Sequence, residues 1–494
     1  MTAMVKKYAH NVTRPFSGLG LTMFSQDDFT NIHNASLEIF EEIGIKVESE
    51  EALEIFAGAG ASVTRETGYG IVKIPAWLVE DCIASTPGTV VYKGRTPDKD
   101  FTVSPGRVSF STFGECLNVI DPVTRKHRAS TKQDNANIAR LCDSFDEIGM
   151  VLRPVGACDM PGPTQSVHNA HALFSNTSKH LHVGAVNRQN LAVIHKMCDA
   201  IAGGADKFAE RGFYTCALCP TSPLTLVQDC CDMIIDCARK PGSGIQPISM
   251  ALAGASGPAT LAGTLVNHNV EVLSAIILGQ LVRKGMRSVY AGISTIMDMK
   301  QMVATMGAPE LGMLGAGVAN MARHYNIPCL VGSGVCDSKI PDAQSAYEAT
   351  FSMMTGALSG ANFVYGLGTL DQGMTFDFAK FITDVEMAKM IFHAMNGIPV
   401  SDETLALDLT RQVGPGGEFL TQKHTFQHMR ELSQPFVFDR RNRAKWEADG
   451  AKDITEVAYE KAAAIINSHE PTPLSDDIAK ELQDIVDAYE REIL

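Results

Sequence analysis

Short apolar runs alternate with longer segments of helical periodicity between residues 149 and 409, and this rhythm constrains the fold most. The runs are too short for helices and almost wholly apolar, which is typical of strands buried on both faces of a parallel sheet. Their spacing of about 30 to 45 residues is that of repeated strand–helix units. Seven such runs are found, at 150–156, 180–186, 213–219, 244–252, 288–295, 328–335 and 362–370.

Helical patterns fill the intervals between the runs. They lie at 163–178, 189–202, 226–239, 258–283, 309–325 and 341–359, and another at 379–395 follows the seventh run. We expect an eighth strand between Ile398 and Leu409, although Asp402 and Glu403 make it the least apolar. Eight units predict an α/β fold, a closed (β/α)₈ TIM-type barrel, whose strand-end loops carry function. The alternative is an open doubly wound sheet, which the lack of a Gly-x-Gly-x-x-Gly fingerprint after any run disfavours.

The flanking segments predict two further regions. Residues 1–147 read as an N-terminal α+β region, with capping boxes at Ser25 and Thr131 opening helices and a β-hairpin or meander over 101–128. Residues 148–412 then form the barrel. Residues 413–494 are polar and charged, and predict a C-terminal helical extension that forms an outer layer or a subunit contact in a homo-oligomer.

The charge balance limits the partners. The chain has 42 Lys+Arg against 56 Asp+Glu, a formal net charge of −14, which argues against nucleic acid or an anionic membrane. No apolar run approaches the roughly 20 residues of a membrane helix, and no apolar core follows the N-terminal lysines as in a signal peptide. Twelve scattered cysteines are expected to be buried thiols rather than disulfides. We therefore expect a cytoplasmic protein.

Motifs for metal or nucleophilic catalysis are weak. Cys216-x-x-Cys219 has the spacing of half a zinc site, but residues three apart on a strand point to opposite faces, so two buried structural cysteines are expected. No metal site is predicted, and there is no Gly-x-Ser-x-Gly elbow or Walker loop. The strand-end loops hold few titratable groups, chiefly Asp337, Lys339, Asp371 and His168. This favours binding of something large, or of a compact neutral or cationic group, over extensive acid–base chemistry.

Several motifs in order resemble one family. They are the stretch DSKIPDAQSAYEA at 337–349, the Gly-Ala-Asn strand that follows, Val-Gly-Pro-Gly-Gly-x-Phe-Leu at 413–420, and His424-Thr-x-x-His428-x-Arg430. Together they resemble the trimethylamine methyltransferase family over nearly the whole chain. The resemblance implies a TIM-type barrel that moves a methyl group from an amine to the cobalt(I) of a separate corrinoid protein. No tightly bound cofactor is then expected, because the partner carries the corrinoid.

The resemblance also narrows the substrate. Family members acting on trimethylamine carry pyrrolysine in the barrel, whereas this chain has only standard residues, also across Gly332 to Lys339. It is thus similar to the non-pyrrolysine branch, which demethylates quaternary amines. Glycine betaine, leaving dimethylglycine, is the foremost case, and proline betaine and carnitine are alternatives. Two other readings are an unrelated barrel lyase or aldolase using Lys339, and a non-catalytic scaffold that binds a corrinoid protein.

The implied chemistry selects candidate residues. A quaternary ammonium leaves as a neutral tertiary amine, so the displacement needs positioning rather than a general acid. Its trimethylammonium head favours aromatic faces and soft sulfur. Candidates for that head are Phe110, Phe113, Met250, Tyr365 and Phe376, with core packing as the alternative for each aromatic residue. Candidate donors to a substrate carboxylate are His168, Asn187, Thr221, Ser333 and Gln344. Asp337 is the candidate catalytic residue, with a loop-capping carboxylate as the alternative.

Overall fold

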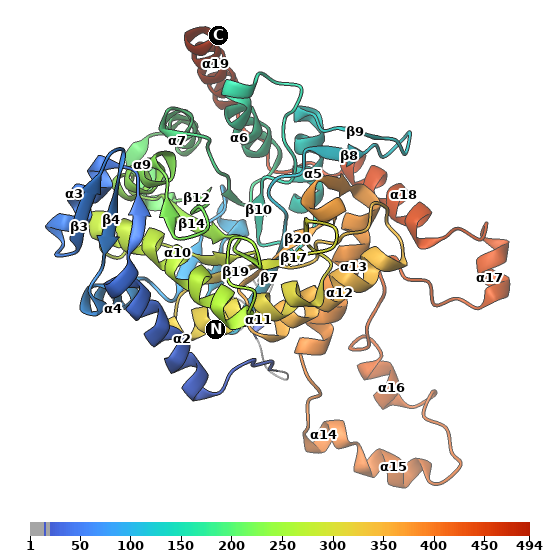
Figure 1. Cartoon of the computed structure of the whole chain (residues 1–494). Helices are drawn as coiled ribbons and strands as arrows, with labels where there is room; N and C mark the ends of the chain where they lie inside the picture. Colours follow the sequence, from blue (N-terminus) through green and yellow to red (C-terminus); the bar gives the residue numbers. More distant parts are fainter. Residues whose placement is uncertain (1–13, 16–19) are drawn as a thin grey trace.

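Eight parallel strands form a sheet that nearly closes into a barrel in the computed structural model, which describes residues 14–15 and 20–494 (Figure 1). In order around the sheet they are β10 (Met150–Leu152), β11 (His180–His182), β12 (Tyr214–Leu218), β14 (Gly244–Ser249), β16 (Tyr290–Gly292), β19 (Cys329–Gly332), β20 (Phe363–Leu367) and β7 (Arg107–Thr112). Seven of these coincide with the apolar runs, so the repeated strand–helix rhythm is confirmed. The architecture is consistent with a TIM-type barrel.

The eighth strand comes from a different part of the chain than we predicted. β7 pairs in parallel with β20, and Phe110 makes an isolated parallel bridge to Ile148, just before β10. The stretch 398–409 is not a strand, because Ser401 caps a short helix, α14 (Asp402–Leu405), and α15 (Leu407–Val413) follows. Neither helix has a buried residue, so this stretch lacks the apolar surface that a barrel strand needs.

Hydrogen bonds from side-chain hydroxyls of β7 to main-chain carbonyls of β10 join these two strands, where the sheet closes; we call this junction the seam. Ser111 Oγ donates to the carbonyl oxygen of Met150 and Thr112 Oγ1 to that of Leu152, each at 2.9 Å. The meander expected over 101–128 is therefore only partly right. β6 (Phe101–Val103) pairs with β5 (Val90–Tyr92) and β8 (Asn118–Ile120) with β9 (His127–Ala129) as antiparallel pairs, but β7 between them belongs to the barrel.

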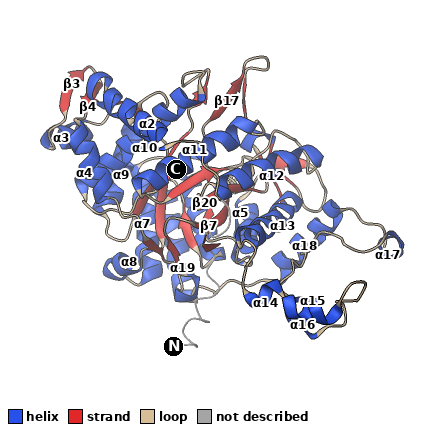
Figure 2. Cartoon of the chain, turned by 90° about the horizontal axis from the view of Figure 1, so that it is seen from below, coloured by secondary structure: helices blue, strands red, loops and turns tan. Residues whose placement is uncertain are grey.

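Helices cover the outside of the sheet (Figure 2). They are α5 (Lys132–Asp143), α6 (Gln165–Asn176), α7 (Arg188–Ala202), α9 (Gln228–Arg239), α10 (Leu261–Val282), α11 (Pro309–Tyr325), α12 (Ala343–Leu358) and α13 (Phe378–Met395). The prediction that no segment approaches membrane length was wrong, since α10 is long and apolar enough to cross a bilayer. However, 72% of its most apolar window is buried within the fold, as in the core helix of a soluble protein.

Packed side chains fill the barrel. The β5–β6 hairpin contributes Tyr92, Phe101 and Val103 to a cluster that contains Met150, Leu152, Ile248, Leu330, Phe363 and Tyr365 from the strands. His182 of β11 hydrogen-bonds through Nδ1 to Oε1 of Gln246 in the same interior. Burial lowers the pKa of His182 to about 3, so its ring stays neutral. The interior is a packed core rather than a channel.

The two ends of the chain pack around this barrel. The predicted capping boxes at Ser25 and Thr131 are both present, before α2 (Gln26–Glu38) and α5. The helical C-terminus is confirmed: α18 (Ile454–Ser468) packs on α13, and α19 (Asp476–Ile493) packs on α7. Before α18 in the chain, α14, α15 and α16 (Lys423–His428) stand away from the body at the bottom of Figure 1. The division at 147/148 and 412/413 stays a prediction, although the sheet draws β7 from before residue 148.

Candidate functional site

Two aromatic rings meet at the carboxyl ends of adjacent strands β7 and β20. Phe113 follows β7, and its ring stacks on Tyr365 with centroids 5.8 Å apart and planes 12° apart. Tyr365 is 2% exposed and Phe113 is half-buried. Gly366 follows Tyr365 at φ +135°, where an added Cβ would lie 2.2 Å from Ser333 O. Glycine is therefore required for the irregularity in β20 that sets the Tyr365 ring.

Cys219 lies at the end of β12 and is exposed, whereas Cys216 is buried, so the prediction of two buried cysteines is wrong for Cys219. Although Cys219 reaches the surface, the surrounding loops desolvate its thiol and raise its pKa, and the guanidinium of Arg153 acts against that rise. Burial also raises the pKa of Tyr365, to which the Cys219 thiol adds. The phenol is neutral at physiological pH. Arg153 follows β10, Cys219 follows β12 and Tyr365 lies two residues before the end of β20, so all three belong to the carboxyl ends of the parallel strands.

Arg153 and Glu115 form an ion pair at the same end. Arg153 follows β10 and Glu115 follows β7, and Arg153 Nη2 lies 2.5 Å from Glu115 Oε2. Their loops pair through the main chain, because Cys116 N–H donates to Pro154 O and Gly156 N–H donates to Cys116 O, each at 2.9 Å. The two side chains therefore project from one stiff ladder.

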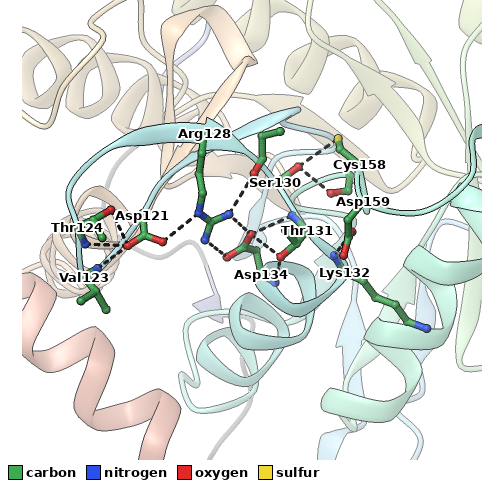
Figure 3. Close-up of polar contacts among 12 residues, drawn as sticks. Asp121, Val123, Thr124, Arg128, Ser130, Thr131, Lys132, Asp134, Cys158 and Asp159 are labelled. Atoms are coloured by element: carbon green, nitrogen blue, oxygen red, sulfur yellow. Dashed lines mark hydrogen bonds and ion pairs between the residues drawn. The ribbon is translucent and has the colours of Figure 1, made fainter.

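Polar contacts connect these two paired loops to the segment that leads into α5 (Figure 3). Ser130 Oγ lies 2.7 Å from Gly156 O, and Lys132 N–H donates to Asp159 Oδ1 at 2.7 Å. Arg128 ties the β8–β9 turn to the start of α5, with Nε 2.9 Å from Asp121 Oδ2 and Nη1 2.6 Å from Asp134 Oδ2 (Figure 3). Hydrogen bonds from the turn hold the pKa of Asp121 down at about 2, so this brace stays ionised.

Four of the predicted binding residues direct their side chains toward the core or the outer helices. Phe110 faces outward, with its ring centroid 5.2 Å from that of Phe392 on α13. Phe376 packs in the core against Phe378 at 5.4 Å. Ser333 Oγ donates to its neighbour Gly332 O and faces α11 and α12. His168 joins three outer helices, since its ring nitrogens contact Lys132 Nζ at 3.1 Å and Glu490 Oε1 at 2.8 Å.

Of the remaining predicted residues, Asn187, Thr221 and Met250 lie on loops after strands, and Gln344 lies in the first turn of α12. Asn187 caps α7 by accepting from Asn190 N–H at 3.0 Å, and Gln344 is exposed and donates to Glu348. Thr221 is exposed in the turn after β12, and Met250 is exposed after β14.

Asp337 has the structure of a loop brace. Its Oδ1 accepts from Met306 N–H at 2.7 Å, and its own N–H donates to Glu348 Oε2 at 2.7 Å. The carboxylate thus connects the β19–α12 loop to the segment before α11. This arrangement matches the loop-capping alternative.

Exposed apolar side chains surround the strand ends. They come from loops after five different strands and include Leu117, Val186, Met250, Met299, Met302 and Met374. Met299 and Met302 lie at the turn between β17 (Thr295–Asp298) and β18 (Val303–Thr305), and Figure 2 shows β17 projecting from the body. We call these six residues the apolar rim. Exposed apolar residues that gather into one patch mark interaction surfaces, and these six lie on loops at the same end of the sheet.

Sequence reasoning missed Arg153, Glu115 and Cys219. The signal for Arg153 was its position directly after the interior residue Leu152, at the end of an apolar run. Glu115 gave no comparable signal, because β7 was not recognised as a barrel strand. Within the part of the chain that the structure describes, no three His, Cys, Asp or Glu residues are arranged to hold a metal ion.

Comparisons with known proteins agree with the sequence motifs. The family model described as trimethylamine methyltransferase (MTTB) matches residues 2–493. Trimethylamine methyltransferase MttB of Desulfitobacterium hafniense (strain DSM 10664 / DCB-2) is 48% identical over 475 residues, 96% of this chain and 95% of that protein. Trimethylamine methyltransferase MttB of Methanosarcina barkeri is 38% identical over 99% of both chains. Glycine betaine methyltransferase of D. hafniense (strain Y51) is 29% identical over 95% of this chain and 98% of that protein.

Proposed function

Because this chain belongs to the trimethylamine methyltransferase family and is a methyltransferase, we propose that it demethylates a quaternary amine, with glycine betaine as first choice. The methyl group passes to the cobalt(I) of a corrinoid on a partner protein, and dimethylglycine remains. Proline betaine and carnitine are the related alternatives. The observation that carries the proposal is the stacked pair Phe113–Tyr365 above a filled barrel.

The leaving group favours a quaternary substrate. A methyl group leaves trimethylamine only after the nitrogen gains a proton or another bond, whereas a quaternary nitrogen leaves neutral without help. Three groups near the strand ends are poor proton donors: Glu115 is paired with Arg153, Asp337 braces a loop, and the Tyr365 phenol has a raised pKa. These groups suit a substrate that needs no proton.

The residues of this chain then bind the substrate and orient its reacting methyl group. A trimethylammonium head is attracted to aromatic faces, by up to about 2 kcal/mol when the site is desolvated. Leu152, Ile248 and Tyr365 fill the barrel below, so the substrate lies on top with a methyl group facing outward. Holding one methyl group in line with its acceptor is catalysis by positioning.

The apolar rim suits a protein partner that covers the strand ends. Contact over its methionines would exclude water from the reacting methyl group, and methionine adapts to an irregular surface. The partner's corrinoid supplies the electron pair that attacks the methyl carbon, while the pair of the breaking C–N bond stays on nitrogen. No proton or external oxidant enters this balance.

Trimethylamine is the second candidate, because relatives named for it are 48% and 38% identical, against 29% for the relative named for glycine betaine. An aldolase using Lys339 has less support, since Lys339 Nζ is exposed and donates to Asp337 O at 2.6 Å. A scaffold without activity is the remaining alternative.

We also propose a cytoplasmic homo-oligomer. All twelve cysteines are free thiols, which suits a reducing compartment. Helices α14, α15 and α16 contain no buried residue, and we call the segment 402–428 that they span the arm. The arm exposes Leu405, Leu407, Leu420 and Phe426. Contact with a second copy would cover them.

One experiment separates the candidates. The purified chain is mixed with reduced corrinoid protein and, in turn, glycine betaine, proline betaine, carnitine, choline and trimethylamine, while cobalt(I) absorbance is followed. We expect the absorbance to decay with glycine betaine. Decay with trimethylamine alone would support the second candidate, and binding of the corrinoid protein without decay for any amine would support the scaffold.

A further inference from the structure

We propose that Arg153 and Glu115 form a receptor for a zwitterion. The Arg153 guanidinium takes the substrate carboxylate, while Glu115 and the stacked rings of Phe113 and Tyr365 take its trimethylammonium head. This inference rests on the proposed function and names what the site selects: betaines, in preference to methylated amines without a carboxylate.

The guanidinium has donors to spare. Arginine carries five N–H groups, and Glu115 Oε2 occupies Nη2 of Arg153 at 2.5 Å. Arg153 Nε is buried and has no hydrogen-bond partner within the described protein. An unpaired buried donor costs about 1–3 kcal/mol, which a carboxylate at this edge of the guanidinium would recover. Planar, two-point binding of carboxylate is the geometry that arginine provides.

The ion pair is held in place before any ligand arrives. Glu115 Oε1 accepts from Asn169 Nδ2 at 3.2 Å. The Asn169 side chain is fully buried, and its Oδ1 accepts from Ala157 N–H at 2.8 Å and from Asn135 Nδ2 at 3.3 Å. Together with the main-chain ladder between the two loops, these bonds fix the direction of the pair. A fixed receptor loses little entropy when a ligand binds.

The pair lies beside the aromatic rings. Glu115 is two residues from Phe113 on the loop after β7, and Gly114 between them packs close to Leu152, the residue before Arg153. Phe113 in turn stacks on Tyr365, with ring centroids 5.8 Å apart. Both charges and both rings therefore belong to one end of the barrel.

Charge balance gives the selectivity. Arg153 and Glu115 are together neutral, so a zwitterion laid against them in the opposite sense meets an opposite charge at each end. Choline would leave the spare donors of Arg153 unpaired, and a carboxylate without an ammonium would meet the like charge of Glu115. Leaving a desolvated charge unpaired is the expensive outcome in both cases.

The test measures equilibrium binding by calorimetry, without any corrinoid protein. The ligands are glycine betaine, choline as the cation without a carboxylate, and 3,3-dimethylbutanoate as the uncharged-head isostere of glycine betaine. The variants are R153Q and E115Q. K339Q is the matched control, because Lys339 is a loop cation near the strand ends that lies 65% exposed and outside the receptor.

We expect the native chain to bind glycine betaine at least about 30-fold more tightly than either analogue. R153Q should weaken the binding of glycine betaine by about 30-fold and the binding of choline by less than about threefold. E115Q should weaken the binding of choline and strengthen the binding of 3,3-dimethylbutanoate. K339Q should bind all three ligands as tightly as the native chain does. If R153Q does not fold, judged by its melting curve, R153K replaces it, with an expected loss of about tenfold for glycine betaine.

Equal weakening of glycine betaine and choline in R153Q, or no weakening of either, would overturn the receptor. The proposed function fails separately, in the methyl-transfer assay. A chain that binds betaine as described but transfers no methyl group refutes the function and leaves the receptor standing. A chain that transfers the methyl group but shows no dependence of binding on Arg153 does the reverse.

Discussion

Replacing the stacked aromatic rings by leucine should reduce methyl transfer in proportion to the desolvation of each ring. Contact of a trimethylammonium head with the ring of Tyr365, which is 2% exposed, would be desolvated, so the proposal requires an attraction near the upper value of about 2 kcal/mol, or about 30-fold in kcat/KM. Phe113 is half-buried, so about 1 kcal/mol, or about fivefold, is expected. Leucine keeps the apolar volume and removes the ring face.

Phe110 supplies the matched control. It lies only three residues before Phe113, but its ring faces outward against Phe392 at 5.2 Å. F110L should lower stability by about 1 kcal/mol through lost packing and leave KM unchanged. The assay is steady-state cobalt(I) consumption with glycine betaine, together with denaturant unfolding of each variant. A KM increase in F110L as large as that in F113L, or an unchanged kcat/KM in Y365L, would refute the placement of the ammonium head.

Four further predictions concern stability and assembly. K380M should cost about 3–5 kcal/mol in denaturant unfolding, because Lys380 Nζ contacts both Asp384 carboxylate oxygens at 2.6 Å in the interior and the orphaned carboxylate stays buried; a smaller cost in K380M/D384L would confirm the cause. Burial lowers the pKa of His268 to about 3, so between pH 6.5 and 3 the unfolded state binds one more proton there and stability falls with acidification. H268L should therefore reduce the slope of unfolding free energy against pH near pH 5 by about 1.4 kcal/mol per unit, and an unchanged slope would argue against a neutral buried ring. G366A should destabilise the chain by at least about 3 kcal/mol, since its Cβ would meet Ser333 O at 2.2 Å; a melting temperature equal to the native one would contradict this. L420D/F426D in the exposed arm should leave the melting temperature of the isolated subunit unchanged and shift light scattering toward smaller species, and no change in mass would argue against the arm as a subunit contact.

Periodicity was sufficient to predict most of the barrel. Seven strands and the helices that follow them lie where the apolar runs and helical patterns placed them, because strands buried on both faces leave a near-continuous apolar signal. β7 was not recognised as a barrel strand because Ser109, Ser111 and Thr112 interrupt that apolar signal. Their hydroxyls donate hydrogen bonds to β10 and to the residues just before it. No local sequence pattern predicts such bonds.

The site residues were less predictable, and the reason is side-chain direction. Phe113 and Tyr365 were both predicted as aromatic candidates; they lie near strand ends and stack, while their role in binding stays a prediction. Phe110, three residues earlier, faces the other side of the strand, and His168 lies between outer helices. The facing of a residue depends on strand bounds and bulges that composition does not encode. Arg153 and Glu115 meet only because β7 and β10 are neighbours across the seam.

The most direct test of the central claim follows the methyl group itself. Glycine betaine labelled with ¹³C in its methyl groups is incubated with the chain and reduced corrinoid protein, and ¹³C NMR records where the label goes. Transfer at this site predicts equal amounts of labelled methyl on the corrinoid protein and of dimethylglycine in solution, both reduced about 30-fold in rate by Y365L. Label that stays on glycine betaine, or that reaches the corrinoid protein equally fast with Y365L, would contradict the account.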